Sequence, residues 1–314
     1  MAKQIPEVDI IVDHEAGVIR EVQPEKKLRS KKGHERNVNI TIYAILIVIS
    51  IIWLLPFVFL VLQSFRSYLT ESGGMVDYLL PKAFSLDNYK FLLNPNECQF
   101  LRWYGNTFVI AFFCAIIQTA FVLCVSYALS RLRFKGRKLF MKMVLVLGMF
   151  PGFLTMIALY FLLKQFGLTQ EGAIPGLILV TVASSGMGYY ISKGFFDTVP
   201  KSLDESARID GCTRLQVFYK IILPMAKPTV IYTILTAFMG PWGDYVFASY
   251  VAFGHTDSYN VAVGLFRWVN TNDYQGYFTR FCAGGVLVAV PITILFMCLQ
   301  KYYVEGVTGG AVKG

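Results

Sequence analysis

The segment between Ser202 and Pro228 holds the most informative polar residues of the chain. Ser202 and Glu205 have the S-x-x-E spacing of a capping box, in which each side chain accepts a hydrogen bond from the other residue's backbone N–H. Gly211 follows about two turns later and is the residue type best able to adopt the left-handed conformation that ends a helix. We therefore predict a short capped helix from Leu203 to about Asp210, followed by a turn. A helix this short needs a partner to be stable, which is typical of a docking element, although a solvated loop helix would show the same pattern.

A second group of polar residues interrupts an apolar segment near Asp244. The stretch Phe238-Met-Gly-Pro-Trp-Gly-Asp-Tyr245 places this carboxylate beside helix-breaking residue types. A carboxylate within a membrane segment usually faces a polar cavity or a partner, and broken helices at membrane depth are tolerated where they line a cavity. We therefore expect Asp244 to line a pathway through the membrane, and a wetted position near the outer interface is the alternative. Asn106 and Gln118, in an earlier apolar segment, are further candidates for the same pathway.

The other reactive residue types form no catalytic or metal-binding pattern in the sequence. The six cysteines contain no C-x-x-C pair, and the three histidines are far apart. The sequence also lacks the G-x-x-x-x-G-K-[ST] loop that binds nucleotide phosphates. We therefore expect no catalytic residue, no metal site and no bound cofactor in this chain, and no ATP bound in the manner of a P-loop.

The amino-acid composition indicates a protein that is largely embedded in a membrane. Of the 314 residues, 55% are hydrophobic and only 16% are charged, which is too apolar for a soluble domain. Apolar runs of about 20 residues are long enough to cross a bilayer as helices. We predict an all-α integral membrane domain between residues 38 and 300. Its six transmembrane helices are expected at about residues 38–65, 103–130, 139–163, 172–192, 228–250 and 281–300.

The distribution of basic residues predicts how these helices are oriented. Residues 1–37, 131–142, 193–227 and 301–314 together contain 22 of the 29 Lys and Arg residues. Because basic loops stay in the cytoplasm, both termini are expected there as tails 1–37 and 301–314, together with the polar loop 202–228. The net charge of +9 is explained by this topology and does not require a nucleic-acid partner. The first of these tails has no apolar core of the kind found in a cleavable signal peptide.

The polar loop also resembles a motif of a known family. Glu205-Ser-Ala207 is followed after three residues by Gly211, and after nine more by Ile221-x-Leu-Pro224. This spacing resembles the EAA loop of ABC importer permeases, except that Ser206 stands where the family usually has Ala. The resemblance extends from about Ile40 to Gly314 and implies the type I permease fold.

In that family the loop forms a coupling helix that docks into a cleft of a cytoplasmic ATPase subunit. The resemblance implies that Glu205 pairs with a basic group of the ATPase, that Ala207 packs closely, and that Gly211 makes the turn. The residues expected to couple this chain to an ATPase are Glu205, Ser206, Ala207, Asp210 and Gly211.

Three further stretches resemble the carbohydrate branch of the family. Gly240-Pro-Trp-Gly-Asp244, Ala262-Val-Gly-Leu265 and the C-terminal sequence Tyr302 to Gly314 look like those of maltose/maltodextrin-type permease subunits, although Gly243 stands where the family often has Asn. By this resemblance, Trp242 and Tyr245 could stack on sugar rings in the pathway. Aromatic residues at that depth also serve as packing or interface residues.

The resemblance implies the subunits of a complete importer in a prokaryotic inner or plasma membrane. These are a second permease subunit, two ATPase subunits that carry ATP and Mg²⁺, and an extracytoplasmic sugar-binding protein. Closure of the ATPase pair is expected to move the coupling helix and switch the pathway between inward- and outward-facing states, which differ in their affinity for each partner. One alternative is a permease for another solute, such as a polyol, a glycerophosphodiester or a uronic-acid oligosaccharide. An ion-coupled carrier or channel would need paired intramembrane charges or an inverted repeat, whereas the sequence has one intramembrane carboxylate.

Overall fold

The computed structural model of the chain describes residues 10–12, 19–21, 31–67, 80–270 and 274–311. They belong to two compact units, Met1–Val58 and Phe59–Gly314, each with its own internal contacts. Most of the expected tail 1–37 lies outside the described residues.

The first unit contains a short antiparallel pair of strands and the beginning of a long helix. Strands β1 (Ile10–Val12) and β2 (Ile19–Glu21) pair with Ile11 opposite Arg20. Their Ile and Val residues are β-branched and favour extended backbone. Helix α1 (Lys31–Ser64) begins before the expected start of the first span at residue 38 and ends in the second unit. Outside this pair of strands, every regular element of the described residues is helical.

The second unit consists of long apolar helices joined by short helical turns. Its elements are α2 (Asp87–Leu93), α3 (Phe100–Arg131), α4 (Arg137–Gly148), α5 (Gly152–Gln165), η2 (Gln170–Gly172), α6 (Ala173–Ala183), α7 (Gly186–Thr198), α8 (Lys201–Ile209), α9 (Arg214–Val217), η3 (Phe218–Ile222), α10 (Leu223–Met225), α11 (Lys227–Gly243), α12 (Val246–Ala252), η4 (Thr256–Ser258), α13 (Val261–Val269) and α14 (Tyr274–Ala311).

Three continuous helices are long and apolar enough to cross a membrane, namely Arg36–Ser64, Phe100–Arg131 and Tyr277–Tyr302. Three bent helix pairs pass the same criteria: α4 with α5 at 102°, residues Gln170–Ala183 with α7 at 40°, and Arg214–Met225 with α11 at 84°. By length and composition, the described residues therefore contain three candidate spans, or up to six if each bent pair crosses once. The first of these breaks falls at Pro151, which lacks the N–H that a continuous helix would use.

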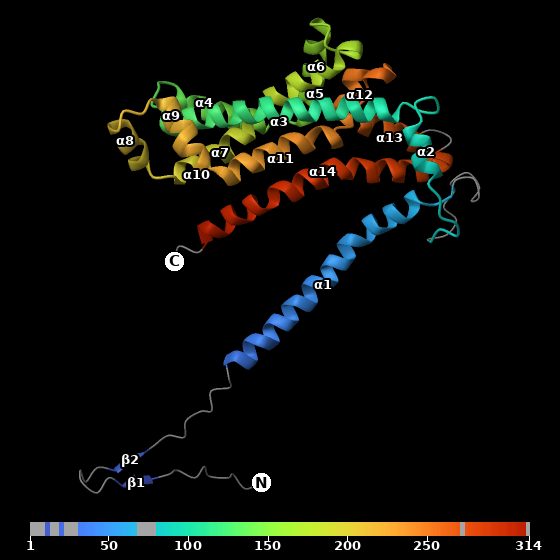
Figure 1. Ribbon diagram of the computed structural model, residues 1–314. Helices are drawn as coiled ribbons and strands as arrows, with labels where there is room; N and C mark the ends of the chain where they lie inside the picture. Colours follow the sequence, from blue (N-terminus) through green and yellow to red (C-terminus); the bar gives the residue numbers. More distant parts are fainter. Residues whose placement is uncertain (1–9, 13–18, 22–30, 68–79, 271–273, 312–314) are drawn as a thin grey trace. The chain divides into compact units, whose positions relative to one another are not determined.

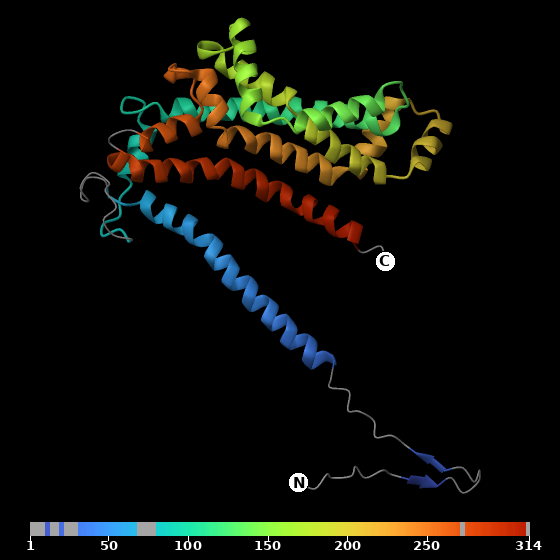
Figure 2. The ribbon, with the colours of Figure 1, turned by 180° about the vertical axis from the view of Figure 1, so that it is seen from behind.

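Helix α3 is the central element of the second unit. It packs against α6, α7, α11 and α13, and α11 packs in turn against α14. Figures 1 and 2 show α3, α11 and α14 running side by side, with α8, α9 and α10 gathered at one end of the bundle and α2 and α13 at the other. Helix α14 continues to Ala311 and so extends into the expected tail 301–314.

At the end of the bundle near α13, the backbone of this helix lies very close to an aromatic ring of α3. Gly264 on α13 faces the indole ring of Trp103 on α3, and a Cβ at residue 264 would overlap that ring. Trp103 is buried in the main apolar cluster and donates its Nε1–H to the Thr256 carbonyl at 3.0 Å. Glycine therefore allows α13 to lie directly against α3.

Candidate functional site

The C-terminal end of helix α8 requires glycine. The left-handed turn predicted at Gly211 is confirmed, with φ +85°. Its N–H donates to the Arg208 carbonyl at 3.1 Å, and the Cys212 N–H donates to the Ala207 carbonyl at 2.9 Å. These two bonds are the pair that defines a Schellman motif, and the side chains of Cys212 and Ala207 belong to one apolar cluster, as that motif favours. The sequence therefore stops α8 sharply and fixes the direction in which the chain leaves it.

The capping box predicted at Ser202 and Glu205 is wrong. Helix α8 begins at Lys201, directly after Pro200, and its N-terminus has no side-chain capping bond. Because the helix starts before Ser202, that residue lies within the first turn. The capping box of this loop is formed instead by Thr213 and Gln216 at the start of α9, where Gln216 N–H donates to Thr213 Oγ1 at 3.3 Å and Thr213 N–H donates to Gln216 Oε1 at 2.7 Å. The T-x-x-Q spacing in the sequence was the signal that could have identified it.

The two faces of α8 have different surroundings. Ala207 is buried against an apolar cluster that also contains Phe196 of α7 and Val217 of α9. On the opposite face, Glu205 is exposed and the Ile209 side chain is 86% exposed. A small residue at position 207 lets α8 lie close to the bundle, while the outer face stays available to another molecule.

An ion pair joins α8 to the end of α3. Arg131 Nε lies 3.2 Å from Asp204 Oδ2, and the two side chains are only 4% and 16% exposed. Arg131 also donates to the Val199 carbonyl at 2.8 Å. Burial raises the pKa of the Asp204 carboxyl; Arg131 opposes this shift and Glu205 adds to it. This buried pair therefore ties α8 to the end of α3.

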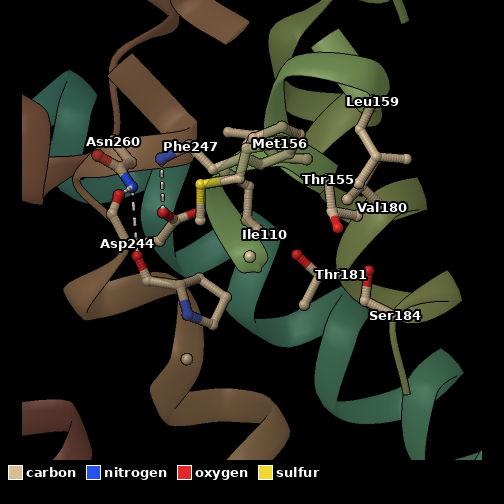
Figure 3. A pocket seen from close by; sticks show the side chains of 14 residues that line it. Ile110, Thr155, Met156, Leu159, Val180, Thr181, Ser184, Asp244, Phe247 and Asn260 are labelled. Atoms are coloured by element: carbon tan, nitrogen blue, oxygen red, sulfur yellow. Dashed lines mark hydrogen bonds between the residues drawn. The ribbon is translucent and has the colours of Figure 1, made fainter. Parts of the chain in front are cut away.

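A cavity of about 370 Å³ lies where helix α11 breaks. Asp244 lines it from the link between α11 and α12, and Thr155 of α5, Thr181 of α6 and Ser184 line the opposite side (Figure 3). Most of the remaining lining is apolar, and no Lys, Arg or His is among the described lining residues. A mainly apolar cavity with a few placed polar groups is the usual form of a small-molecule site.

Hydrogen bonds hold the break in this conformation. Asp244 Oδ1 accepts from the Phe247 N–H at 3.2 Å and so caps α12. The Asn260 amide donates to the Asp244 carbonyl at 2.6 Å and to the Pro241 carbonyl at 3.3 Å, while its oxygen accepts from the Val263 N–H. Asn260 also lines the cavity and was not anticipated from the sequence. Its position before the apolar run of α13 is a helix N-cap signal that could have drawn attention to it.

The two aromatic residues proposed for stacking do not line this cavity. Trp242 is buried in the core, with its ring 5.1 Å from that of Tyr104 in an edge-on arrangement. Tyr245 packs against Phe266, with ring centroids 3.9 Å apart. In the described part of the chain, both rings pack against other aromatic side chains.

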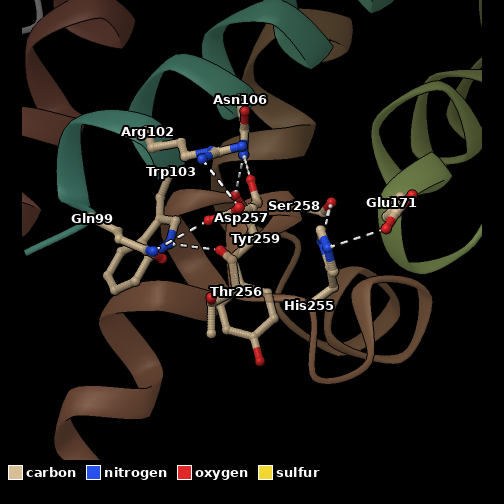
Figure 4. Close-up of polar contacts among 10 residues, drawn as sticks. All are labelled: Gln99, Arg102, Trp103, Asn106, Glu171, His255, Thr256, Asp257, Ser258 and Tyr259. Atoms are coloured by element: carbon tan, nitrogen blue, oxygen red, sulfur yellow. Dashed lines mark hydrogen bonds and ion pairs between the residues drawn. The ribbon is translucent and has the colours of Figure 1, made fainter.

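Asn106 and Gln118 also lie away from the cavity. Asn106 donates to the carbonyls of Asp257 and Tyr259 at 2.8 and 2.9 Å and anchors the η4 loop to α3 (Figure 4). Arg102 supports the same loop through Asp257 at 3.2 Å. Gln118 Oε1 is buried on α3 and has no hydrogen-bond partner in the part of the chain that the structure describes.

Comparison with known proteins gives this arrangement its family context. Residues 120–309 match the family model described as binding-protein-dependent transport system inner membrane component. The chain is 38% identical over 239 residues to the galactooligosaccharides transport system permease protein GanQ of Bacillus subtilis (strain 168), covering 75% of this chain and 83% of that protein. It is 34% identical over 276 residues to the maltodextrin transport system permease protein MdxG of the same strain, covering 88% of this chain and 96% of that protein.

A solved structure shows the same fold. A chain of a bacterial ABC transporter involved in the import of the acidic polysaccharide alginate superimposes with a TM-score of 0.69 at 21% sequence identity, over 86% of this chain and 98% of that chain. The chain belongs to the family of binding-protein-dependent transport system inner membrane components, and is a membrane permease subunit of an ABC importer rather than an enzyme.

Proposed function

We propose that this chain forms one half of the pathway of an importer for neutral oligosaccharides of the maltodextrin type. The observation that carries the proposal is the cavity at the break of α11, where one carboxylate, three hydroxyl groups and one amide line an otherwise apolar space. Sugar hydroxyls both donate and accept hydrogen bonds, so this set of groups suits them. The relatives named as maltodextrin and galactooligosaccharide permeases support the same class of substrate.

The charge of the cavity distinguishes between the remaining solutes. A uronic-acid oligosaccharide or a glycerophosphodiester carries negative charge, and Asp244 would repel it where no basic side chain is among the described lining residues. Neutral sugars are therefore favoured over these anions. A polyol remains a second candidate because its hydroxyls present the same chemistry.

We further propose six membrane spans with both termini and helix α8 in the cytoplasm. The three continuous helices and the three bent pairs supply up to six crossings. The location of 22 of the 29 Lys and Arg residues in the tails and in the loops on the side of α8 supports this orientation.

In this scheme α8 is the docking element for an ATPase subunit. Glu205, Ser206 and Asp210 are exposed and available to the partner, whereas Ala207 and Gly211 set the position and the end of the helix. The proposed assembly also contains a second permease subunit, two ATPase subunits carrying ATP and Mg²⁺, and an external sugar-binding protein. The absence of a nucleotide-binding G-x-x-x-x-G-K-[ST] loop from the sequence supports placing ATP on the ATPase subunits. Closure of that pair would move α8, and the Arg131–Asp204 pair would pass the movement to α3.

The test is substrate-stimulated ATPase activity of the complete complex in proteoliposomes. The co-expressed subunits and the binding protein are supplied with malto-oligosaccharides, galacto-oligosaccharides, a polyol and a uronic-acid oligomer in turn. Stimulation by the neutral oligosaccharides alone is expected. Stimulation by the uronic-acid oligomer to the same extent would contradict the assignment of substrate class, and failure to co-purify an ATPase would contradict the coupling scheme.

A further inference from the structure

A second cavity, of about 440 Å³, is lined by helix α8, helix α9 and the end of α3. It is lined by six basic residues, which are Arg131, Arg133, Arg137, Lys201, Arg208 and Arg214. The acidic residues that line the cavity are Asp204 and Glu205, so basic side chains outnumber acidic ones. The pair of Arg131 with Asp204 is the one ion pair among these described side chains, so five basic groups are left without a carboxylate within salt-bridge distance. A concave surface of this charge attracts anions.

The buried member of this group, Arg131, has spare hydrogen-bonding capacity. Its side chain is 4% exposed, with Nε against Asp204 and one terminal nitrogen donating to the Val199 carbonyl. The other terminal nitrogen, Nη1, has no hydrogen-bond partner in the described part of the chain. A buried guanidinium N–H without an acceptor costs free energy, so an anionic oxygen that reached it would stabilise the site.

Asp204, the acidic partner of Arg131, has an acceptor atom without a donor. Asp204 Oδ1 is buried and also has no hydrogen-bond partner among the described residues. The other oxygen of this carboxylate, Oδ2, is held by Arg131 Nε at 3.2 Å. An occupant that presents an anionic oxygen to Arg131 and a hydroxyl donor to Asp204 would satisfy both atoms.

We propose that this basic cavity binds a phosphate group that also carries a hydroxyl, either the headgroup of phosphatidylglycerol or free hydrogen phosphate. Arginine is the residue type whose planar fork matches phosphate oxygens, and four of the five unpaired basic groups are arginines. The cavity volume is that of a small-ligand site. Its position at the end of a membrane helix, beside the basic turn 131–138, is where an anionic leaflet would meet the protein.

A matched pair of double variants tests the site. Arg133→Gln with Arg137→Gln removes two charges from the cavity wall, and Lys135→Gln with Lys142→Gln removes two charges from exposed neighbours that do not line it. All four side chains lie at or near the surface, so both double variants are expected to fold. The complete importer complex is used throughout, so that α8 carries its natural partner.

Two probes distinguish the sources of the phosphate. Native mass spectrometry counts the phosphatidylglycerol retained by complexes extracted from phosphatidylcholine vesicles made with and without that lipid. Equilibrium dialysis with radiolabelled inorganic phosphate measures binding to the delipidated complex. We expect the arginine variant to bind at least one of these probes about tenfold more weakly than wild type, because charge-assisted hydrogen bonds are lost. The lysine variant should stay within about twofold, because only screened charges change.

Phosphate binding without lipid retention would assign the site to the free anion, and lipid retention that inorganic phosphate does not displace would assign it to the headgroup. The proposal is overturned if neither probe binds, or if the arginine and lysine variants weaken binding equally. It is also overturned if the arginine variant loses the ATPase subunit with anion binding unchanged, since the cavity would then be a protein contact. These measurements involve neither sugar nor ATP turnover, so their failure leaves the proposed transport function unaffected.

Discussion

Replacement of Gly211 by valine should impair coupling between the ATPase and the pathway without preventing assembly. Gly211 has φ +85°, and no heavy atom lies within 4 Å of a Cβ built at this position. The substitution therefore meets open space, and its cost is the strain of a left-handed residue alone. That strain is about 1–2 kcal/mol for a residue with a Cβ, and a β-branched residue such as valine is a genuine outlier there.

The consequence is local to the end of α8. A cost of that size shifts the equilibrium from the hydrogen-bonded turn towards an opened turn, in which residue 211 leaves the left-handed conformation, by roughly 5- to 30-fold. The two bonds that depend on the turn, to the carbonyls of Arg208 and Ala207, would be lost in the opened form. Helix α8 would then lose its defined end, although Ala207 and the pair with Arg131 would still hold it to the bundle.

The assay is the ratio of sugar taken up to ATP hydrolysed in proteoliposomes that contain the complete complex. The ratio should fall in Gly211→Val, with subunit stoichiometry unchanged. Gly211→Asn is the matched control, since asparagine tolerates the left-handed conformation and should stay close to wild type. Gly194→Val controls for a β-branched residue at an exposed helical glycine with open space around it. A normal ratio in Gly211→Val, or an equal loss in Gly211→Asn, would refute the argument from backbone strain.

Three other substitutions test the cavity, the packing of α13 and the buried ion pair. Asp244→Asn keeps an acceptor for the Phe247 N–H and should leave thermal stability unchanged while altering sugar uptake, whereas Asp244→Ala should also lose about 1 kcal/mol of stability with the helix cap. Gly264→Ala should lower the stability of the complex in detergent by about 1–3 kcal/mol in thermal unfolding, because the new methyl overlaps the ring of Trp103. Asp204→Asn should change the pH dependence of thermal unfolding. Since burial raises the pKa of Asp204, its contribution to stability is present below the ordinary carboxyl pKa and is lost as pH rises through the raised value. Wild type should therefore lose stability relative to the variant as pH rises above the ordinary carboxyl pKa of about 3.9.

Each of these has an outcome that would contradict it. Sugar uptake by Asp244→Asn equal to wild type for every substrate would leave Asp244 only its capping role. Gly240→Ala, at a position where a Cβ meets nothing within 4 Å, is the control for Gly264→Ala, and equal effects of the two would rule out the overlap with Trp103. A constant difference in melting temperature between wild type and Asp204→Asn over the whole pH range would show that the carboxyl is not perturbed.

Several features could be predicted because they depend on neighbours along the chain. Long apolar runs form helices in any apolar surrounding, and Pro151 interrupts one because it lacks a backbone donor. The turn at Gly211 follows from the conformational freedom of glycine. The EAA-like spacing around Glu205 placed the chain in its family, which comparison with known proteins supports.

The capping-box spacing was ambiguous because two segments of the same loop have it. Ser202 with Glu205 and Thr213 with Gln216 both have capping-box spacing, but only the second pair forms the box. The first fails because the helix already begins at Lys201, after Pro200. A spacing rule identifies residues able to cap a helix and does not decide where the helix starts.

By itself, the sequence determined a membrane-embedded helical protein of the ABC permease family, a break in a helix at Asp244 and a sharp turn at Gly211. Only the tertiary structure decided that Thr155 and Thr181 face Asp244 across a cavity while Trp242 is buried in the core. It also brought Arg131 beside Asp204, which lies on a separate helix far along the chain. The physical reason is that helix formation and turn geometry are set by adjacent residues, whereas the lining of a cavity depends on which faces of distant helices pack together.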